Sequence, residues 1–364
     1  MNLIELHILQ SFPVTCLNRD DVGAPKSALF GGTQRARVSS QCWKRAIRMQ
    51  ATELAPESFA GQRTRFVVRE LKNAFLEAAQ DDTRAGLLAT AAADAIGTLD
   101  SVEKGNVKTL LFFSPDELTG VVQAMLECEF GDELATAYNP EADKKAREKA
   151  LKSVKDKAKK AVKAFGGKVK DAADISIFGR MVADDHSLMV EGAGLFSHAL
   201  STHSTANEID FFAAVDDKNT MGDEGAGHIG TLEFNSACYY RYVGLNCDLL
   251  AEHLEACSDD ERAAIQAAFL RAAILAVPAA RKNSMFGQNP PEYVLGLRRT
   301  GQPLSLVNAF ESPVRSSQGY VKDSIGELKR HWNKLADTYC LKDQVQTEEN
   351  IPESNLNDFI AKLT

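Results

Sequence analysis

The sequence has few cysteines, no long apolar run and no tract rich in glycine or proline. Its seven cysteines include no C-x-x-C pair, which argues against a zinc ribbon and a disulfide framework and favours a reducing compartment. No apolar segment is long enough to span a membrane, and the N-terminus lacks the basic region and cleavage site of a signal peptide. We therefore expect a cytoplasmic protein that has no membrane partner.

Motifs of common nucleotide-binding classes are missing as well. There is no G-x-x-x-x-G-K-[ST] and no RNP1 signature, which excludes P-loop chemistry at motif level and RNA binding through the RNP1 aromatic platform. A G-x-G-x-x-G occurs at residues 225–230, but a polar loop precedes it and a strand-like segment follows it. A dinucleotide site needs a strand before this motif and a helix after it, so we reject it.

Charge is distributed unevenly along the chain. The formal net charge is −8, yet residues 144–170 carry twelve basic and only two acidic side chains. Residues 16–50 carry two acidic and seven basic side chains, the latter being Arg19, Lys26, Arg35, Arg37, Lys44, Arg45 and Arg48. Two basic segments in an otherwise acidic chain predict surfaces that bind a polyanion. For residues 144–170, a solvated helix face explains the charge equally well.

The first 54 residues predict a strand, a loop, a second strand and a helix. Residues 3–9 alternate as a central strand does, and Arg35 and Arg37, two residues apart, point to the same side of a short strand. Ser39-Ser40 is an N-cap signal for a helix over 41–54 with Trp43, Ile47 and Leu54 inward. The length of 364 residues allows two or three packed units, or one domain with a large insertion.

The remainder of the chain predicts a helical block followed by a mixed region. Residues 56–137 are largely helical with a turn at Ser114-Pro115, and a lysine-rich helix runs from Asn139-Pro140 to Gly166-Gly167. The runs 175–181 and 229–243 favour strands, and the polar stretch 201–228 between them is longer than a routine connection. Three more helices are expected, opened by Ser258, Ser324 and Ser354. This order predicts an α+β fold, a split β-α-β sheet with insertions.

Residues 35–48 form the strongest local constellation. Arg35 and Arg37 approach a helix N-terminus, whose N–H groups favour an anion, and Ser39 and Ser40 add hydroxyl donors. Further along one face of the helix follow, at spacings of three and four, Gln41, Lys44 or Arg45, and Arg48. Such a face predicts contacts to consecutive phosphates of one strand. The alternative is an ordinary capped surface helix, although no acidic residue lies between 35 and 48.

A metal-dependent RNA or DNA nuclease is the alternative function. Asp184, Asp185 and His186 would carry it, with further histidines and aspartates scattered through the following loop, but these residues lack helical metal-ligand spacing. Asp-Asp pairs in polar loops are usually turn chemistry, so we expect no catalytic residue, no metal and no cofactor. Phe211-Phe212 packs in the core or stacks on unpaired bases, and on a strand the two rings face opposite sides.

Ordered blocks of the sequence resemble the CasC family, the CRISPR RNA (crRNA)-binding backbone subunits of the type I-E CRISPR Cascade complex. The first blocks are Cys16-Leu-Asn-Arg-Asp-Asp21, Phe30-Gly-Gly32 and Arg35-x-Arg-Val-Ser-Ser-Gln41 with Lys44-Arg-Ala46. Later blocks are Gly179-Arg-Met181, Thr202-His203, Asp210-Phe-Phe, His228-x-Gly-Thr-x-Glu-Phe-x-Ser236, Tyr240-Arg-Tyr242 and Asn308-Ala-Phe-Glu311. The resemblance covers 1–50 and about 175–315.

The resemblance implies a fold shaped like a right hand, with a palm, fingers and a thumb. It gives an RRM-like (ferredoxin-like) palm over 1–55, 171–200 and 229–338, helical fingers over 56–170, a thumb loop over 201–228, and a C-terminal tail and helix over 339–364. Copies would polymerise head-to-tail along crRNA beside the subunits CasA, CasB, CasD and CasE. The protein would act without catalysis, displaying the bases for pairing with target DNA in antiviral defence.

The resemblance also implies residue roles. In the palm, crRNA phosphates would be held by Arg19, Lys26, Arg35, Arg37, Ser39, Ser40, Gln41, Lys44, Arg45 and Arg48. Arg180 and Met181 would lie against the kinked backbone, Met181 as an apolar wedge. The thumb residues that displace a base would be Thr202, His203, Phe211 and Phe212, and the fingers residues that attract duplex DNA would be Lys145, Lys149 and Lys152.

Overall fold

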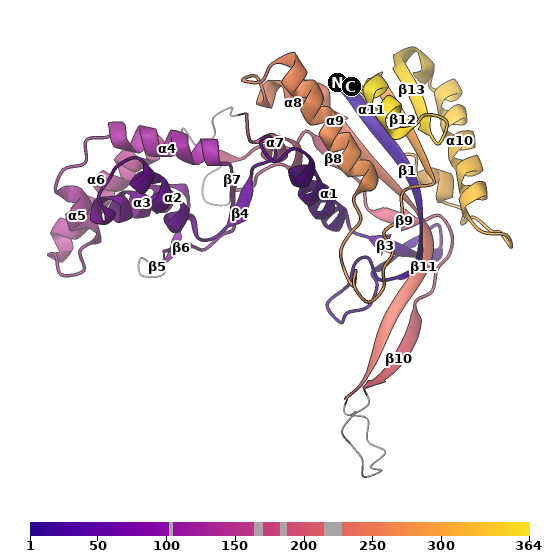
Figure 1. The fold of residues 1–364 in the computed structure, drawn as a ribbon, viewed down its shortest axis with the longest axis horizontal. Helices are drawn as coiled ribbons and strands as arrows, with labels where there is room; N and C mark the ends of the chain where they lie inside the picture. Colours follow the sequence, from indigo (N-terminus) through magenta and orange to yellow (C-terminus); the bar gives the residue numbers. More distant parts are fainter. Residues whose placement is uncertain (102–104, 164–169, 183–187, 215–227) are drawn as a thin grey trace, which may run out of the picture. The chain divides into compact units, whose positions relative to one another are not determined.

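The computed structural model describes residues 1–101, 105–163, 170–182, 188–214 and 228–364 (Figure 1). The chain forms two compact units. The first unit comprises Met1–Leu54, Gly194–Asp248 and Gln266–Thr364, and the second comprises Ala55–Ala193 and Leu249–Ile265. The mixed α+β class predicted from the sequence is confirmed.

The first unit is built on one antiparallel sheet. Its strands lie in the order β13-β12-β1-β11-β9-β3-β2, and β8 and β10 also pair with β11. The bounds are β1 Asn2–Thr15, β2 Ser27–Phe30, β3 Thr33–Val38, β8 Gly194–Phe196, β9 Ala199–Ser201, β10 Glu208–Ala214, β11 His228–Asn246, β12 Tyr293–Thr300 and β13 Val345–Ile351. The predicted central strand at 3–9 is confirmed, since β1 lies between β11 and β12.

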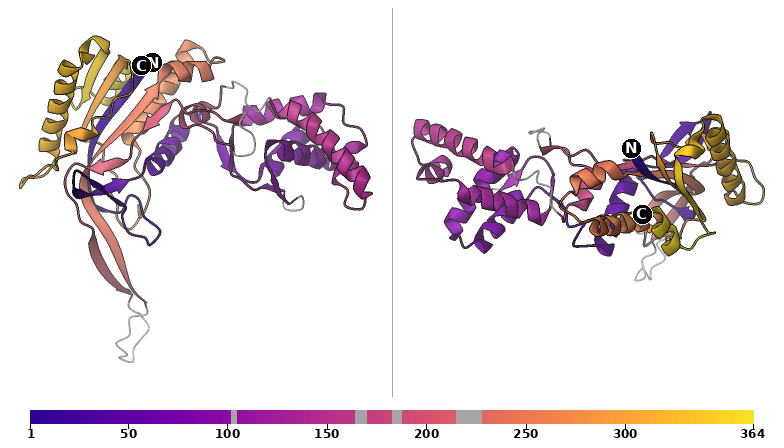
Figure 2. Two further views of the ribbon diagram at one scale, coloured as in Figure 1. Left: turned by 180° about the vertical axis from the view of Figure 1, so that it is seen from behind. Right: turned by 90° about the horizontal axis from the view of Figure 1, so that it is seen from above.

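Helices cover both faces of this sheet, which explains why β1 is buried along most of its length. One face carries α1 (Ser40–Leu54), the end of α9 (Asp259–Leu275) and α11 (Leu356–Leu363). There Arg241 donates to the carbonyls of Ala273 and Ile274, and its guanidinium lies 4.2 Å from the centre of the Trp43 ring. The other face carries α10 (Val321–Thr338) and the 3-10 helix η3 (Val307–Phe310) (Figure 2).

Helix α1 follows the predicted pattern except at its end. Trp43, Ile47 and Ala51 are buried at intervals of four, whereas Leu54 is 41% exposed in the last turn. The Ser39 hydroxyl accepts from the N–H of Cys42 at 3.2 Å, as an N-cap residue does. The helix therefore begins where the sequence predicts it.

The second unit is mainly helical. Its helices are α2 Val67–Glu77, α3 Asp82–Ile96, α4 Pro115–Glu127, α5 Glu133–Tyr138, α6 Lys144–Val162 and α7 Ala173–Phe178; α8, Cys247–His253, begins at its boundary. Short strand pairs join β4 Gln62–Thr64 to β7 Leu111–Phe113 and β5 Leu99–Ser101 to β6 Asn106–Val107. Ser114-Pro115, predicted as a turn, is the N-terminus of α4 with a full capping box.

Several predicted boundaries are wrong. The run 175–181, expected as a strand, overlaps the end of helix α7, because a short apolar run fits a buried helix as well as a strand. Helix α6 begins after Asp143, since the Asn139 side chain accepts from Glu141 N and makes a local turn instead of a cap. The predicted stop at Gly166-Gly167 lies outside the described residues.

The N-caps of the last three predicted helices agree only in part with the prediction. Ser258 and Glu261 form the expected capping box. Ser324, however, lies inside α10 and donates to the Tyr320 carbonyl, and Asn355 rather than Ser354 caps α11. A second 3-10 helix, η4 (Leu341–Gln344), follows α10. Among the described residues, no helix combines the length and the hydropathy needed to cross a membrane.

Candidate nucleic-acid interface

The loop before β2 is closed by its own acidic residue. The Asp20 carboxylate accepts hydrogen bonds from the N–H groups of Val22 and Ala24, at 3.0 and 2.9 Å. Lys26 N donates to Asn18 O, and Arg37 N donates to Lys26 O, so the loop is tied to β3. Asp20 thus has a local structural role, and the exposed Arg19 beside it remains accessible to an anion.

The N-terminus of α1 is fixed by two side chains from other segments. Ser39 N donates to Asn18 Oδ1, and Ser40 N donates to His198 Nδ1, both at 2.9 Å. Burial lowers the pKa of His198, and the nearby Arg37 and Lys26 lower it further, so this ring is a neutral acceptor at pH 7. The first turn of α1 therefore lies in a cationic environment that favours an anion.

The outward side of α1 carries the polar residues that the sequence predicts. Gln41 and Arg45 are exposed, one turn apart, and Lys44 and Arg48 are half-buried on the adjacent side. The Lys44 ammonium lies 5.0 Å from the centre of the Phe196 ring. We call the following set the palm strip: Arg19, Lys26, Arg37, Ser39, Ser40, Gln41, Lys44, Arg45 and Arg48.

Four cations of the palm strip form no ion pair with a carboxylate of the described residues. Within the described ranges, no aspartate or glutamate forms an ion pair with Arg19, Lys26, Arg37 or Arg45. A pocket of about 680 Å³ beside the hairpin is lined by Lys26 and Arg37, and also by the acidic residues Asp20, Asp21 and Glu233. The excess positive charge is therefore greatest along α1, away from these three carboxylates.

Arg35, by contrast, is an interior residue. It is fully buried; its guanidinium donates to the carbonyls of Ser201 and Phe310 at 2.9 and 2.8 Å and to the Thr33 hydroxyl at 2.9 Å. The expectation that Arg35 holds a phosphate is therefore corrected, because its donors are already occupied by the protein. Its side chain instead fixes the β2–β3 hairpin, which carries Arg37.

A basic loop after α9 was missed in the sequence. Arg281 and Lys282 lie in it, and Phe286 is 67% exposed. Thr15 donates to Met285 O at 3.1 Å, so the loop is attached to the end of β1. Arg281 and Arg19 both lower the pKa of the Cys16 thiol, although burial raises it overall. More than 230 residues separate these two arginines in sequence, and only the fold brings them to the same thiol.

The predicted thumb region contains a β-hairpin. Strand β10 pairs with the first part of β11, which continues beyond the rest of the sheet (Figure 1). Phe211 is 63% exposed and lies on the same side of β10 as the exposed Ile209. Phe212 is half-buried over Gly230, where a Cβ would overlap its ring. The two phenylalanines thus face opposite sides as expected, and residues 215–227 lie outside the described part of the chain.

Thr202 and His203 are buried, which corrects their expected role in displacing a base. The hydroxyls of Thr202 and Ser324 are hydrogen-bonded to each other at 2.8 Å, and His203 Nε2 accepts from Cys238 N at 3.2 Å. The His203 ring is stacked on Tyr320 with 3.6 Å between ring centres. Both residues hold the first segment after β9 against α10 and β11, so neither side chain is available to RNA.

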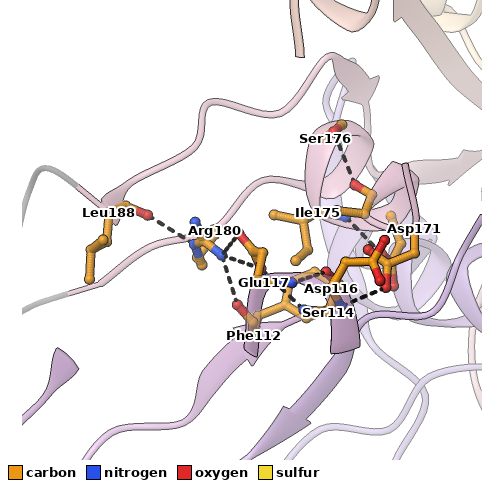
Figure 3. Close-up of polar contacts among 11 residues, drawn as sticks. Phe112, Ser114, Asp116, Glu117, Asp171, Ile175, Ser176, Arg180 and Leu188 are labelled. Carbon is orange, nitrogen blue, oxygen red and sulfur yellow. Dashed lines mark hydrogen bonds and ion pairs between the residues drawn. The ribbon is translucent and has the colours of Figure 1, made fainter. Parts of the chain in front are cut away.

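In the second unit, Arg180 and Met181 differ sharply in exposure. Met181 is 80% exposed, whereas Arg180 is buried and forms an ion pair with Glu117 through both carboxylate oxygens, at 2.7 and 2.8 Å (Figure 3). Burial raises the pKa of Glu117 to about 7, although Arg180 opposes the rise. The expectation that Arg180 lies against the RNA backbone is corrected, because its side chain is buried and paired with Glu117, and Met181 remains a candidate wedge.

Helix α6 presents two kinds of lysine. Lys145, Lys149 and Lys152 are exposed, as expected of residues that meet a polyanion. Lys155 and Lys157 instead form ion pairs with Asp94 and Glu133 within the helical unit. The buried stripe includes Ala150, Val154, Ala158, Ala161 and Val162. The lysine excess is thus partly structural and partly available.

The nuclease alternative gains no support from the described residues. Asp184, Asp185 and His186 lie outside them. Within the part of the chain that the structure describes, no group of three or more histidine, cysteine, aspartate or glutamate residues could hold a metal ion.

The fold is similar to that of chains in solved structures of CRISPR RNA-guided surveillance complexes. One similar solved structure is a chain of a "CRISPR RNA-guided surveillance complex, pre-nicking", with a TM-score of 0.76 and 27% identity over 98% of this chain and 95% of that chain. A second, from a "CRISPR RNA-guided surveillance complex", has a TM-score of 0.58 and 22% identity over 99% and 96%, and shows the fold alone. No curated protein sequence matches the chain. The family model for CT1975-like protein matches residues 4–359, and the chain therefore belongs to the CT1975-like protein family.

Proposed function

We propose that this chain is a non-enzymatic backbone subunit of a type I-E CRISPR Cascade complex that grips crRNA by its phosphates. The single observation that carries the proposal is the palm strip, where exposed and half-exposed cations gather around the N-terminus of α1, and where Arg19, Lys26, Arg37 and Arg45 form no ion pair with a carboxylate of the described residues. Cations placed in this way bind the sugar–phosphate backbone and are indifferent to base sequence. The resemblance to the CasC family and the likeness to chains of CRISPR RNA-guided surveillance complexes support the same role.

The sheet of the first unit supports an RRM-like palm. Strands β12, β1, β11 and β9 lie side by side, with α1 following β1 and α9 following β11 along the chain. This is the arrangement of a β-α-β-β-α-β unit, with the helical second unit inserted after α1. We assign the fingers to the inserted helices and the thumb to the β10–β11 hairpin.

Copies of the chain would polymerise head-to-tail along one crRNA, with CasA, CasB, CasD and CasE as the other subunits. Sequence reading is then left to base pairing between the guide and the target DNA, so the protein needs only to hold backbone and shape. The exposed Phe211 and Met181 would separate bases at intervals, and Lys145, Lys149 and Lys152 would attract the duplex.

The test is to co-express the chain with a CRISPR RNA and measure the nucleic acid and the assembly size of the purified product. We expect RNA of uniform length in assemblies much larger than the 39.7 kDa chain. Lys44→Glu with Arg48→Glu should lower the ratio of RNA to protein without a large loss of thermal stability. Unchanged RNA retention in this variant would refute the assignment of the palm strip.

A matched control carries the same change of charge on the opposite face of the sheet. Lys322 and Lys334 are exposed on α10, so Lys322→Glu with Lys334→Glu should leave RNA retention unchanged. If both double variants lose RNA equally, net charge alone governs binding and no specific strip exists.

A further inference from the structure

Met181 lies next to a backbone bridge between two segments of the second unit. Arg180 and Val190 exchange two backbone hydrogen bonds, each 2.9 Å long, so the chain leaves and returns at one point. Gly179 precedes this point with φ +78, and a Cβ there would lie 3.1 Å from the Val190 carbonyl oxygen. The residue immediately after the closure is Met181, and its side chain is in solvent.

The Arg180 side chain fastens both arms of this closure to α4. Its Nε donates to Leu188 O at 2.9 Å, on the returning arm, and its Nη1 donates to Glu117 and, at 3.3 Å, to Phe112 O (Figure 3). Glu117 is itself held at the start of α4, because its carboxylate accepts from Ser114 N at 3.1 Å. The backbone around Met181 is therefore tied to a helix N-terminus through one guanidinium.

Stability alone does not account for such a pair. Taking two charges out of water costs several kcal/mol for each ion, and apolar residues of similar volume often serve as well or better. The guanidinium has a fixed planar set of donors, so its hydrogen bonds fix the directions of their acceptors. An apolar pair cannot do this. A side chain that must enter a stack of bases at one place requires a backbone held in this way.

We propose that Glu117 and Arg180 are positioning residues that aim the Met181 side chain at the guide RNA. This inference rests on the proposed function, because Met181 meets a guide RNA only if the chain binds one. Neither Glu117 nor Arg180 is assigned an RNA contact of its own. Glu117 and Arg180 act through the direction of the backbone at residue 181, and the thioether of Met181 makes the contact.

The experiment uses the full chain assembled on a guide-length RNA that carries 2-aminopurine at one position per sample. This base analogue fluoresces more strongly when it is unstacked, so it reports where a wedge separates two bases. The pair variant is Glu117→Gln with Arg180→Met, which removes both charges and keeps the side-chain volumes and an acceptor for Ser114 N. Met181→Ala removes the wedge, and the triple variant combines all three changes.

We expect the pair variant to lose the fluorescence maxima to the same extent as Met181→Ala, and the triple variant to lose no more. Changes that act through one side chain are non-additive in this way. Leu328→Ala is the control for lowered stability, because it opens a cavity in the core of the first unit, a cluster that includes none of the described residues of 179–190. It should keep the maxima.

Four results would overturn the proposal, and they point to different errors. Maxima that persist in the pair variant but vanish in Met181→Ala would show that the ion pair does not position the wedge. Losses that add in the triple variant would mean that the pair acts independently of Met181. Maxima that survive Met181→Ala would remove the wedge role itself, and a wild-type chain that retains no RNA would overturn the proposed function as well.

Discussion

The Arg35 guanidinium donates a hydrogen bond to the Phe310 carbonyl at 2.8 Å, although the two residues are 275 positions apart in the sequence. It also reaches the Ser201 carbonyl, so one side chain joins β3, the end of β9 and η3. The β2–β3 hairpin, with Arg37 on it, is therefore held by an interior arginine. An arginine in a cationic motif thus supports the strip without belonging to it.

Arg35→Met should destabilise the fold, because the carbonyls of Ser201 and Phe310 lose buried donors. Each buried acceptor left unpaired costs about 1–3 kcal/mol of unfolding free energy, and urea unfolding measures the sum. Arg37→Met is the control; it changes a half-exposed residue and should stay within about 0.5 kcal/mol while it weakens RNA binding. An Arg35→Met protein of normal stability that binds RNA poorly would restore Arg35 as a contact residue.

Gly31→Ala should be far more damaging than Gly32→Ala. Both glycines have positive φ, +58 and +72, so each alanine brings backbone strain of about 1 kcal/mol. Only at Gly31 would the new Cβ overlap the Glu311 carbonyl, whereas nothing lies near Gly32. The difference in melting temperature between the two variants measures this overlap, and equal melting temperatures would contradict the packing of the hairpin on η3.

The affinity for single-stranded RNA should fall steeply with salt. Each phosphate neutralised by the protein contributes a slope of about 0.7 in log affinity against log salt concentration. Arg45→Gln should therefore lower the slope by about 0.7, since Arg45 is exposed and without an ion pair among the described residues. Fluorescence anisotropy at several salt concentrations gives the slope, and Lys322→Gln on α10 should leave it unchanged.

Stability should fall as the pH is lowered below 6.5, and His7 is one reason. Burial, and secondarily Arg299, lowers the pKa of His7 from 6.5 to about 3, so the folded protein keeps the ring neutral while the unfolded chain takes up a proton. This contribution is complete above pH 6.5 and is lost by about 1.4 kcal/mol per pH unit until pH 3. His203, with a pKa lowered by burial, acts in the same direction.

His7→Phe isolates this effect, because it keeps an aromatic ring next to Tyr240 and Tyr242. Urea unfolding at pH 7 and pH 5 should show the wild type losing about 2 kcal/mol more than the variant. An equal loss in the two proteins would mean that His7 is protonated in the folded state.

Periodicity made much of the first unit predictable. The alternation of β1, the apolar run of β11 and the four-residue spacing of α1 all follow from burial on known faces. The same reasoning failed for the short run 175–181, since all six residues of α7 are buried and the polar Asp174 and Ser176 alternate with apolar residues as they would in a strand. The sequence motifs also did not reveal which of their side chains are buried, because Arg35, Thr202 and Arg180 are covered by residues distant in sequence.

Helices cover both faces of the large sheet, and this affects which guide RNA sequences the protein can hold. Tyr240 and Tyr242, which lie mid-sheet, are packed beneath α10 and offer no ring to a nucleobase. Under the proposed function, the RNA must run along the rim of the domain, where contacts are to phosphate and ribose. A protein built in this way is indifferent to spacer identity, so a host can acquire new spacers without any change to this gene.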